Sequence, residues 1–151
     1  MKHVYLILLN VLLLCSFGNA DSLTPDVNAR IRTITLEGLN KAYNFDFVMA
    51  EKDFDAAARI EPLHPRPYVG KSMIELWRYL IGKNDSAKES FLKLAENAIE
   101  VAEDYEDRFG EDAESKLCLG TIYGYRAFVN GRGKSYIKAA WDGKKSYDYY
   151  I

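Results

Sequence analysis

Apolar residues recur every three or four positions along most of this chain, which is the period of an amphipathic α-helix. Polar residues, glycine and proline interrupt the pattern at short intervals, as at Asn44 and Gly82. The segments between these interruptions are 29–43, 46–61, 67–81, 85–109, 112–128 and 134 to the end. The pattern predicts an all-α domain of about six helices, in which short turns make neighbouring helices antiparallel.

One face of the helix at 46–61 combines small residues with a ring. Ala50, Phe54 and Ala57 are four and then three positions apart, so they share that face. Two small residues beside a ring form a notch that a second helix can approach closely. Pro62 should end the helix, because it lacks an amide hydrogen and its ring clashes with the preceding turn.

Similar faces recur further along the chain. Ala87, Phe91 and Leu94 repeat the spacing of four and then three positions in the helix at 85–109. The small residues of the last helix are Ala139, Ala140 and Gly143. The recurrence favours repeated helix pairs over a single hairpin.

These positions resemble the tetratricopeptide repeat, a pair of antiparallel helices of about 34 residues with characteristic small and aromatic positions. Gly38 matches the small residue of the repeat's first helix. The signature positions of the second helix are matched by Ala50, Phe54, Ala57 and Pro62. Glu37 and Lys41 depart from the pattern, since a leucine and an aromatic residue are usual there.

Two further units resemble the repeat less regularly. One repeat length, about 34 residues, carries the small residue of the first helix onto Ser72. The second helix of that unit contains Ala87 and Phe91, and the third unit has Gly120 and Tyr123. The resemblance covers about 30–151 and implies a right-handed α-solenoid of stacked helix pairs, with an ordinary amphipathic hairpin as the alternative.

Residues 1–20 have the pattern of a secretory signal peptide. Lys2 supplies a positive start, Val4–Phe17 is a mostly apolar run, and Gly18–Ala20 offers small residues for cleavage. The run is shorter than the roughly 20 residues that span a bilayer. We therefore expect cleavage after Ala20 and no membrane span in the mature chain, with a retained anchor helix as the alternative.

Two details of the N-terminal region bear on export. Cys15 could be the lipid-bearing cysteine of a bacterial lipoprotein, but Leu14 breaks the usual requirement for a small residue before it. The polar residues 21–28 are expected to form a loose lead-in to the helical domain at 29–151.

Charge and cysteine content narrow the possible partners and compartments. The formal net charge of −2 is too mild to indicate a nucleic acid or an acidic membrane as partner. Without the signal peptide only Cys118 would remain, so no internal disulfide could form. An exported domain held by packing alone favours a bacterial periplasmic or secreted protein.

The sequence predicts no catalytic, metal or cofactor site. His64 lies between prolines and is expected to be a surface residue, and Cys118 a buried, inert thiol. Residues 131–135 end like a phosphate-binding loop, but Phe128 stands where that motif needs glycine and a helix precedes it. We interpret this segment as a connection between helices.

Charged residues are unevenly distributed along the second half of the chain. The segment 126–145 is basic on balance, whereas 96–114 is acidic and is interpreted as a solvated helix face. The carboxylates of that face are Glu96, Glu100, Glu103, Asp104, Glu106, Asp107, Glu111, Asp112 and Glu114. A partner could recognise this difference in charge.

The resemblance implies that the first helix of each pair lines a concave groove for an extended peptide or a partner helix. In that register Tyr43, Trp77 and Tyr125 are equivalent and form a ladder of rings, with Arg32 and Arg66 near it as a carboxylate clamp. The alternative is that these rings pack between neighbouring helices.

The sequence therefore predicts an exported protein–protein interaction module without enzymatic activity. Two alternatives stay open: a recognition arm of a longer enzyme, and a helical domain that carries a small hydrophobic ligand. The chain ends at Asp148–Ile151 within an apparent helix that lacks a polar end. Because solenoids normally end in a polar capping face, we expect a continuation of the chain rather than a natural terminus that docks elsewhere.

Overall fold

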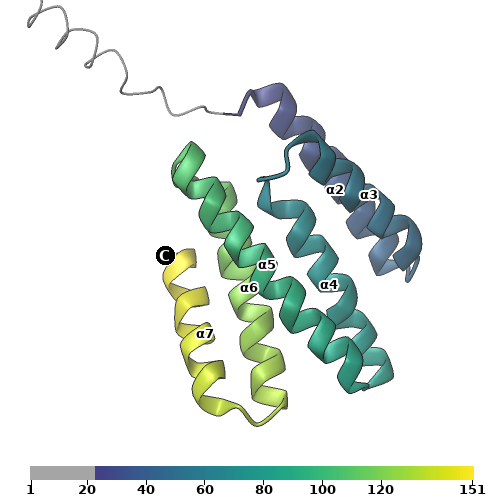
Figure 1. Cartoon of the computed structure of the whole chain (residues 1–151), viewed down its shortest axis with the longest axis vertical. Coiled ribbons are helices and arrows are strands. Elements are labelled where there is room, and N and C mark those ends of the chain that lie inside the picture. The colour runs from purple at the N-terminus through teal and green to yellow at the C-terminus, as the bar shows by residue number, and fades with distance from the viewer. Residues whose placement is uncertain (1–22) are drawn as a thin grey trace, which may run out of the picture.

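The computed structural model describes residues 23–151, which form six α-helices and no strand (Figure 1). The helices are α2 (Pro25–Tyr43), α3 (Phe47–Ile60), α4 (Pro65–Gly82), α5 (Asp85–Phe109), α6 (Ala113–Arg132) and α7 (Tyr136–Tyr150). The predicted all-α class and number of helices are confirmed. The proposed signal peptide at 1–20, with Cys15, lies outside the described residues.

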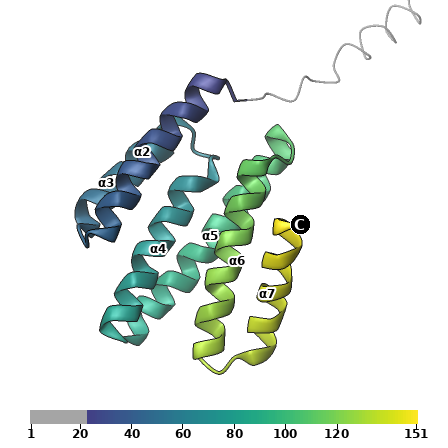
Figure 2. The same cartoon turned by 180° about the vertical axis from the view of Figure 1, so that it is seen from behind.

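Consecutive helices form three antiparallel pairs that follow one another in a row (Figures 1 and 2). The closest packing is within the pairs α2–α3, α4–α5 and α6–α7. Neighbouring pairs meet where α3 packs on α4 and α5 on α6. The first helices also meet, because α4 contacts both α2 and α6. This second set of contacts brings α2, α4 and α6 together along one side.

The start of α2 corrects the prediction that residues 21–28 form a lead-in. The helix already begins at Pro25, and the hydroxyl oxygen of Thr24 accepts a hydrogen bond from the Val27 amide at 3.4 Å. Proline fits the first position of a helix, since an amide hydrogen there would have no helical partner.

The start of α4 corrects two predictions about the proline-rich connection. The helix begins at Pro65, not at Pro67, and both prolines lie in its first turn, where no amide hydrogen is needed. His64 is the N-cap residue, and its Nδ1 accepts a hydrogen bond from the Arg66 amide at 3.4 Å. His64 is only 1% exposed, so its assignment to the surface was wrong. Tyr105 of α5 covers it, with ring centroids 5.7 Å apart.

The notch on α3 is buried as predicted. Ala50, Phe54 and Ala57 have no exposed surface. The Phe54 ring lies against Gly38 of α2 and Gly70 of α4, and a Cβ added to either glycine would come within 2.8 or 2.5 Å of its Cε1 atom. One ring therefore packs together α2, α3 and α4, and it can do so only because both facing positions lack a side chain.

The second and third units follow the predicted signature only in part. In α5, Ala87 and Phe91 are buried, but Leu94 is half-buried and Ala95 takes the fully buried place. In the third unit Gly120 and Tyr123 are buried, and the Tyr150 ring lies over Gly120. The predicted small face of α7 is correct in part, since Ala139 and Gly143 are half-buried whereas Ala140 is exposed.

The turns inside the first and third pairs have the same backbone hydrogen bonds. In the first pair, Asn44 N donates to Asn40 O and Asp46 N donates to Lys41 O. In the third pair, Gly133 N donates to Val129 O and Ser135 N donates to Asn130 O. A shift of 89 residues, from 44 to 133, relates the two sets. In all three pairs a residue with positive φ directly precedes the N-cap of the second helix: Phe45 (63°), Lys83 (49°) and Lys134 (61°). The backbone is therefore repetitive where the side chains are not.

Candidate binding groove

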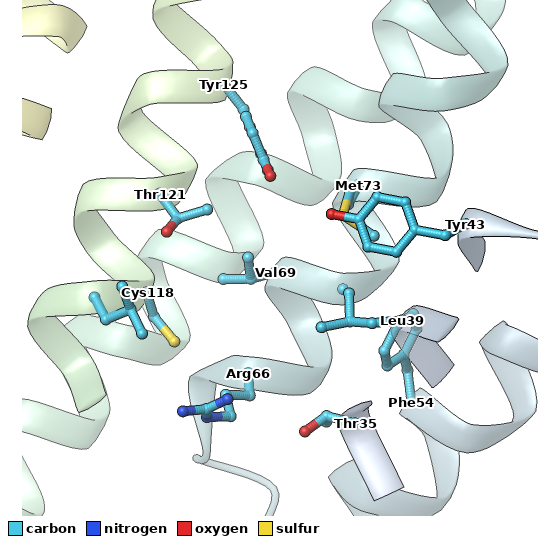
Figure 3. A pocket seen from close by; sticks show the side chains of 12 residues that line it. Thr35, Leu39, Tyr43, Phe54, Arg66, Val69, Met73, Cys118, Thr121 and Tyr125 are labelled. Carbon is cyan, nitrogen blue, oxygen red and sulfur yellow. The ribbon is translucent and has the colours of Figure 1, made fainter. Parts of the chain in front are cut away.

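A groove with a volume of about 160 Å³ lies between the first helices of the three pairs (Figure 3). Each first helix contributes one stripe of side chains three or four positions apart, because residues at that spacing share a helix face. The stripes are Thr35, Leu39 and Tyr43 on α2, Arg66, Val69, Gly70 and Met73 on α4, and Leu117, Cys118, Thr121 and Tyr125 on α6. The second helices contribute a single residue, the ring of Phe54 on α3.

The Phe54 ring reaches the groove because of Gly70. That glycine leaves a gap on α4 through which the ring contacts the cavity, and a Cβ at this position would overlap the ring. Leu39 lies beside the ring, and Val69 and Met73 line the cavity further from it with aliphatic and thioether groups (Figure 3). This part of the groove is apolar.

Arg66 is the one charged residue among those that line the groove, and its charge is balanced. Its Nη2 atom donates to Oε2 of Glu114 at 2.6 Å, and its Nε atom donates to Oε1 of the same carboxylate. Burial lowers the pKa of the Arg66 guanidinium, but the hydrogen bonds and charge of Glu114 outweigh burial and raise it. Arg66 therefore lines the groove as half of an ion pair, with its Nε and Nη2 atoms already bound to Glu114.

Tyrosine rings occupy the open side of the groove. Tyr43 is 60% exposed and meets Trp77 edge to face, with ring centroids 6.2 Å apart. Tyr125 is half-buried, and its hydroxyl is directed toward the middle of the groove (Figure 3). Burial, followed by the nearby phenols of Tyr43 and Tyr150, raises the pKa of Tyr125. The Tyr125 hydroxyl thus remains protonated at neutral pH and can donate a hydrogen bond.

The structure places the proposed partner-binding residues in different surroundings. Tyr43, Arg66 and Tyr125 line the groove, and Trp77 adjoins it through Tyr43. Trp77 also packs against the hydrophobic cluster around Phe54. Arg32 is exposed and does not line the groove. Counting back four positions at a time from Tyr43 would have revealed the rest of the α2 stripe.

The remaining candidates for chemistry are neutral and buried. Burial raises the pKa of the Cys118 thiol, and Glu114 nearby raises it further, so the thiol remains protonated at neutral pH. The predicted burial of Cys118 is confirmed. Burial lowers the pKa of His64, which favours the neutral imidazole. Within residues 23–151 no group of histidine, cysteine and carboxylate side chains could hold a metal ion.

The charged stretches are only partly a solvated surface. Most of the acidic side chains are exposed, but Glu106 and Glu114 are half-buried and bonded to Ser115 and Arg66, which corrects their assignment to a solvated face. In the basic segment, Arg126 is bound to Glu96 and Asp142. Residues 133–135 form a turn between helices, as interpreted, although α6 extends to Arg132 and not only to Phe128.

In a comparison with known proteins, no protein family, curated protein or solved structure matches the chain. Among the described helices, none is long and apolar enough to cross a membrane.

Proposed function

We propose that this chain is an exported protein–protein interaction module, built like a tetratricopeptide protein, that binds an extended segment of a partner protein in the groove. The observation that carries the proposal is that each of α2, α4 and α6 presents one stripe to the same cavity. In a stack of helix pairs, a binding face must be formed by the same helix of every pair. Here all three first helices line the groove, and the second helices contribute only Phe54.

The row of first helices around the groove is wide enough for an extended peptide to lie across them. Packed helix axes lie about 8–10 Å apart, so three neighbouring first helices span roughly 20 Å. An extended chain advances about 3.3 Å per residue, and about six residues would cross that distance. The exposed and half-buried tyrosines on the rim are the type of residue that dominates binding energy in such interfaces.

Export rests on the pattern at residues 1–20 and is proposed with the same function. A bacterial periplasmic or secreted location fits a chain whose other cysteine, Cys118, is buried and has no second thiol with which to pair in the mature protein. Fractionation of cells that express the full chain should recover it, shortened by the signal peptide, outside the cytoplasm. Recovery of the full-length chain in the cytoplasm would contradict this part of the proposal.

The two tryptophans allow a direct test of the groove. Trp77 lies beside Tyr43 at the groove, whereas Trp141 is exposed on α7. Peptides would first be selected from a random library against the purified protein. The Trp141→Phe variant then reports only from Trp77, and the Trp77→Phe variant only from Trp141.

We expect saturable changes in Trp77 emission when selected peptides bind, and no change in Trp141 emission. Peptides that alter only Trp141, or a library that yields no binder, would overturn the proposal. A hydrophobic small ligand is a second candidate, which the apolar lining and the size of the cavity favour. It predicts that Trp77 responds to toluene and to no peptide.

A further inference from the structure

We infer that the groove binds its partner segment through one uncharged, ring-sized apolar side chain, which enters above Phe54 and Gly70. This inference rests on the proposed peptide-binding function and specifies the chemistry of the partner. The occupant is an extended peptide with a phenylalanine-like anchor, and not a peptide held by a carboxylate.

The cavity has the right size for a single ring. Its volume is about 160 Å³, and an apolar cavity of about 150 Å³ is known to admit benzene. The ring of Phe54 and the side chains of Leu39, Val69 and Met73 offer apolar contacts to such an anchor. Burial of one aromatic side chain in apolar surroundings corresponds to about tenfold in affinity or more.

The ion pair between Arg66 and Glu114 disfavours a carboxylate anchor. The guanidinium of Arg66 is held by both oxygens of Glu114, so no net positive charge faces the cavity. An incoming carboxylate would meet only the Arg66 donors that Glu114 leaves free, and it would lose its hydration beside a carboxylate of like charge. A neutral anchor meets neither cost.

The rim supplies the polar part of recognition. The hydroxyls of Tyr43 and Tyr125 point toward the middle of the groove from α2 and α6 (Figure 3). Each can donate a hydrogen bond to a carbonyl group of an extended peptide while the anchor points inward. Such an arrangement separates backbone recognition at the rim from side-chain recognition at the floor.

The test uses a peptide selected against the protein and two versions of it, with the proposed anchor replaced by aspartate or by alanine. Affinities are measured through Trp77 in the Trp141→Phe protein. We expect the selected peptides to share one phenylalanine, leucine or similar residue, and its replacement by aspartate to weaken binding about tenfold or more. Toluene should compete with the parent peptide for the same site.

Two variants of the groove provide matched controls. Val69→Phe fills the cavity from within and should weaken the parent peptide about tenfold, whereas Val101→Phe on α5, which lies outside the lining, should not. Glu114→Gln leaves Arg66 partly unpaired and should reduce the preference for the neutral anchor over aspartate. Glu96→Gln is its control, because Arg126 retains Asp142.

The outcomes separate the inference from the function on which it rests. Peptides that bind the groove with an acidic anchor, or whose affinity toluene and Val69→Phe leave unchanged, would overturn the inference while the peptide-binding function stands. A protein for which no peptide can be selected would overturn both.

Discussion

The first and third helix pairs share a backbone but are stabilised in different ways. Their turns have the same hydrogen bonds, and the shift of 89 residues that relates them also carries the bond between Lys41 and Asp53 onto that between Asn130 and Asp142. The same shift carries Phe54 onto Gly143. The first pair therefore has a ring where the third pair has none, and the third pair has a buried carboxylate where the first has a partly exposed one.

This comparison indicates that the small-and-aromatic signature stabilises the contact between pairs. Phe54 fills the space between its own pair and α4, which packs against α3. The corresponding side of α7 has no covering helix among the described residues, and Tyr136, the counterpart of Phe47, is 68% exposed there. The bonds within each pair need no ring, since Asp142 with Arg126 and Asn130 joins α7 to α6.

The largest effect is expected from the ring itself. Phe54→Ala should lower the free energy of unfolding by about 3–5 kcal/mol, because a fully buried ring is lost and α2, α3 and α4 cannot close around the cavity. Urea denaturation of both proteins measures this loss. The control at the equivalent position is Gly143→Ala, whose new Cβ would lie 4.0 Å from Ala127 Cβ. It should be neutral or stabilise the helix by up to about 1 kcal/mol, and a large loss there would contradict the comparison.

The second effect concerns the bonds within the pairs. Asp142→Ala should cost about 3 kcal/mol, because the Asp142 side chain is only 7% exposed and its loss leaves the guanidinium of Arg126 without its buried partner. Asp53→Ala at the matching position should cost at most about 1 kcal/mol, since Asp53 and Lys41 are 17% and 33% exposed. Thermal unfolding of the two variants would rank them. Equal losses would show that the two bonds are not different in kind.

The third effect depends on pH and arises at the junction between the first and second pairs. Burial lowers the pKa of His64 below its ordinary value of 6.5, against the opposing influence of Glu114. The unfolded chain therefore binds the proton more readily, and the folded state should lose stability as the pH falls below about 6.5, until the pKa of the folded state is passed. Each unit between the two pKa values corresponds to about 1.4 kcal/mol.

The His64→Asn variant isolates this contribution, because asparagine can still cap α4 but does not titrate. Denaturation of both proteins at several values between about pH 5 and pH 8, a range that brackets the ordinary pKa of histidine, gives the slope of unfolding free energy against pH. We expect this slope to be larger for the wild-type chain than for the variant. Parallel curves would show that His64 does not change its protonation on folding in this range.

The smallest effect is a gain in stability at the turns. Phe45 and Lys134 both have positive φ, a conformation that costs a non-glycine residue about 1–2 kcal/mol. Replacement by glycine should stabilise each pair by about 0.5–1 kcal/mol after the added flexibility of the unfolded chain is considered. Lys134→Gly should gain more, because Phe45 also contacts Phe47. A loss of stability at both turns would contradict their common geometry.

Features that depend on neighbours in sequence could be predicted, and those that depend on distant residues could not. The notch at Ala50, Phe54 and Ala57 follows from spacing along one helix, and it is buried as expected. Glu114 lies 48 residues from Arg66, so nothing local shows that it occupies the proposed carboxylate clamp. His64 is covered by a tyrosine from another helix, which also cannot be inferred from the loop in which it lies.

Register within the repeat was the other difficulty. Gly120 resembles the small residue of a first helix, but the turns relate Ala127 to Gly38. They also relate Arg132 to Tyr43, so the predicted equivalence of Tyr43 and Tyr125 was wrong. Small residues recur at several turns of α6, so a sequence motif can match more than one of them. Backbone hydrogen bonds fix the register because they depend on the turn and not on which side chain fills the notch.

The groove is tested most directly by mapping amide chemical shifts as a selected peptide is added to the isotopically labelled protein. We expect the largest changes on the stripes of α2, α4 and α6, around Leu39, Val69 and Thr121. Changes concentrated on α3, α5 and α7, away from Phe54, would contradict the claim that the first helices form the binding surface.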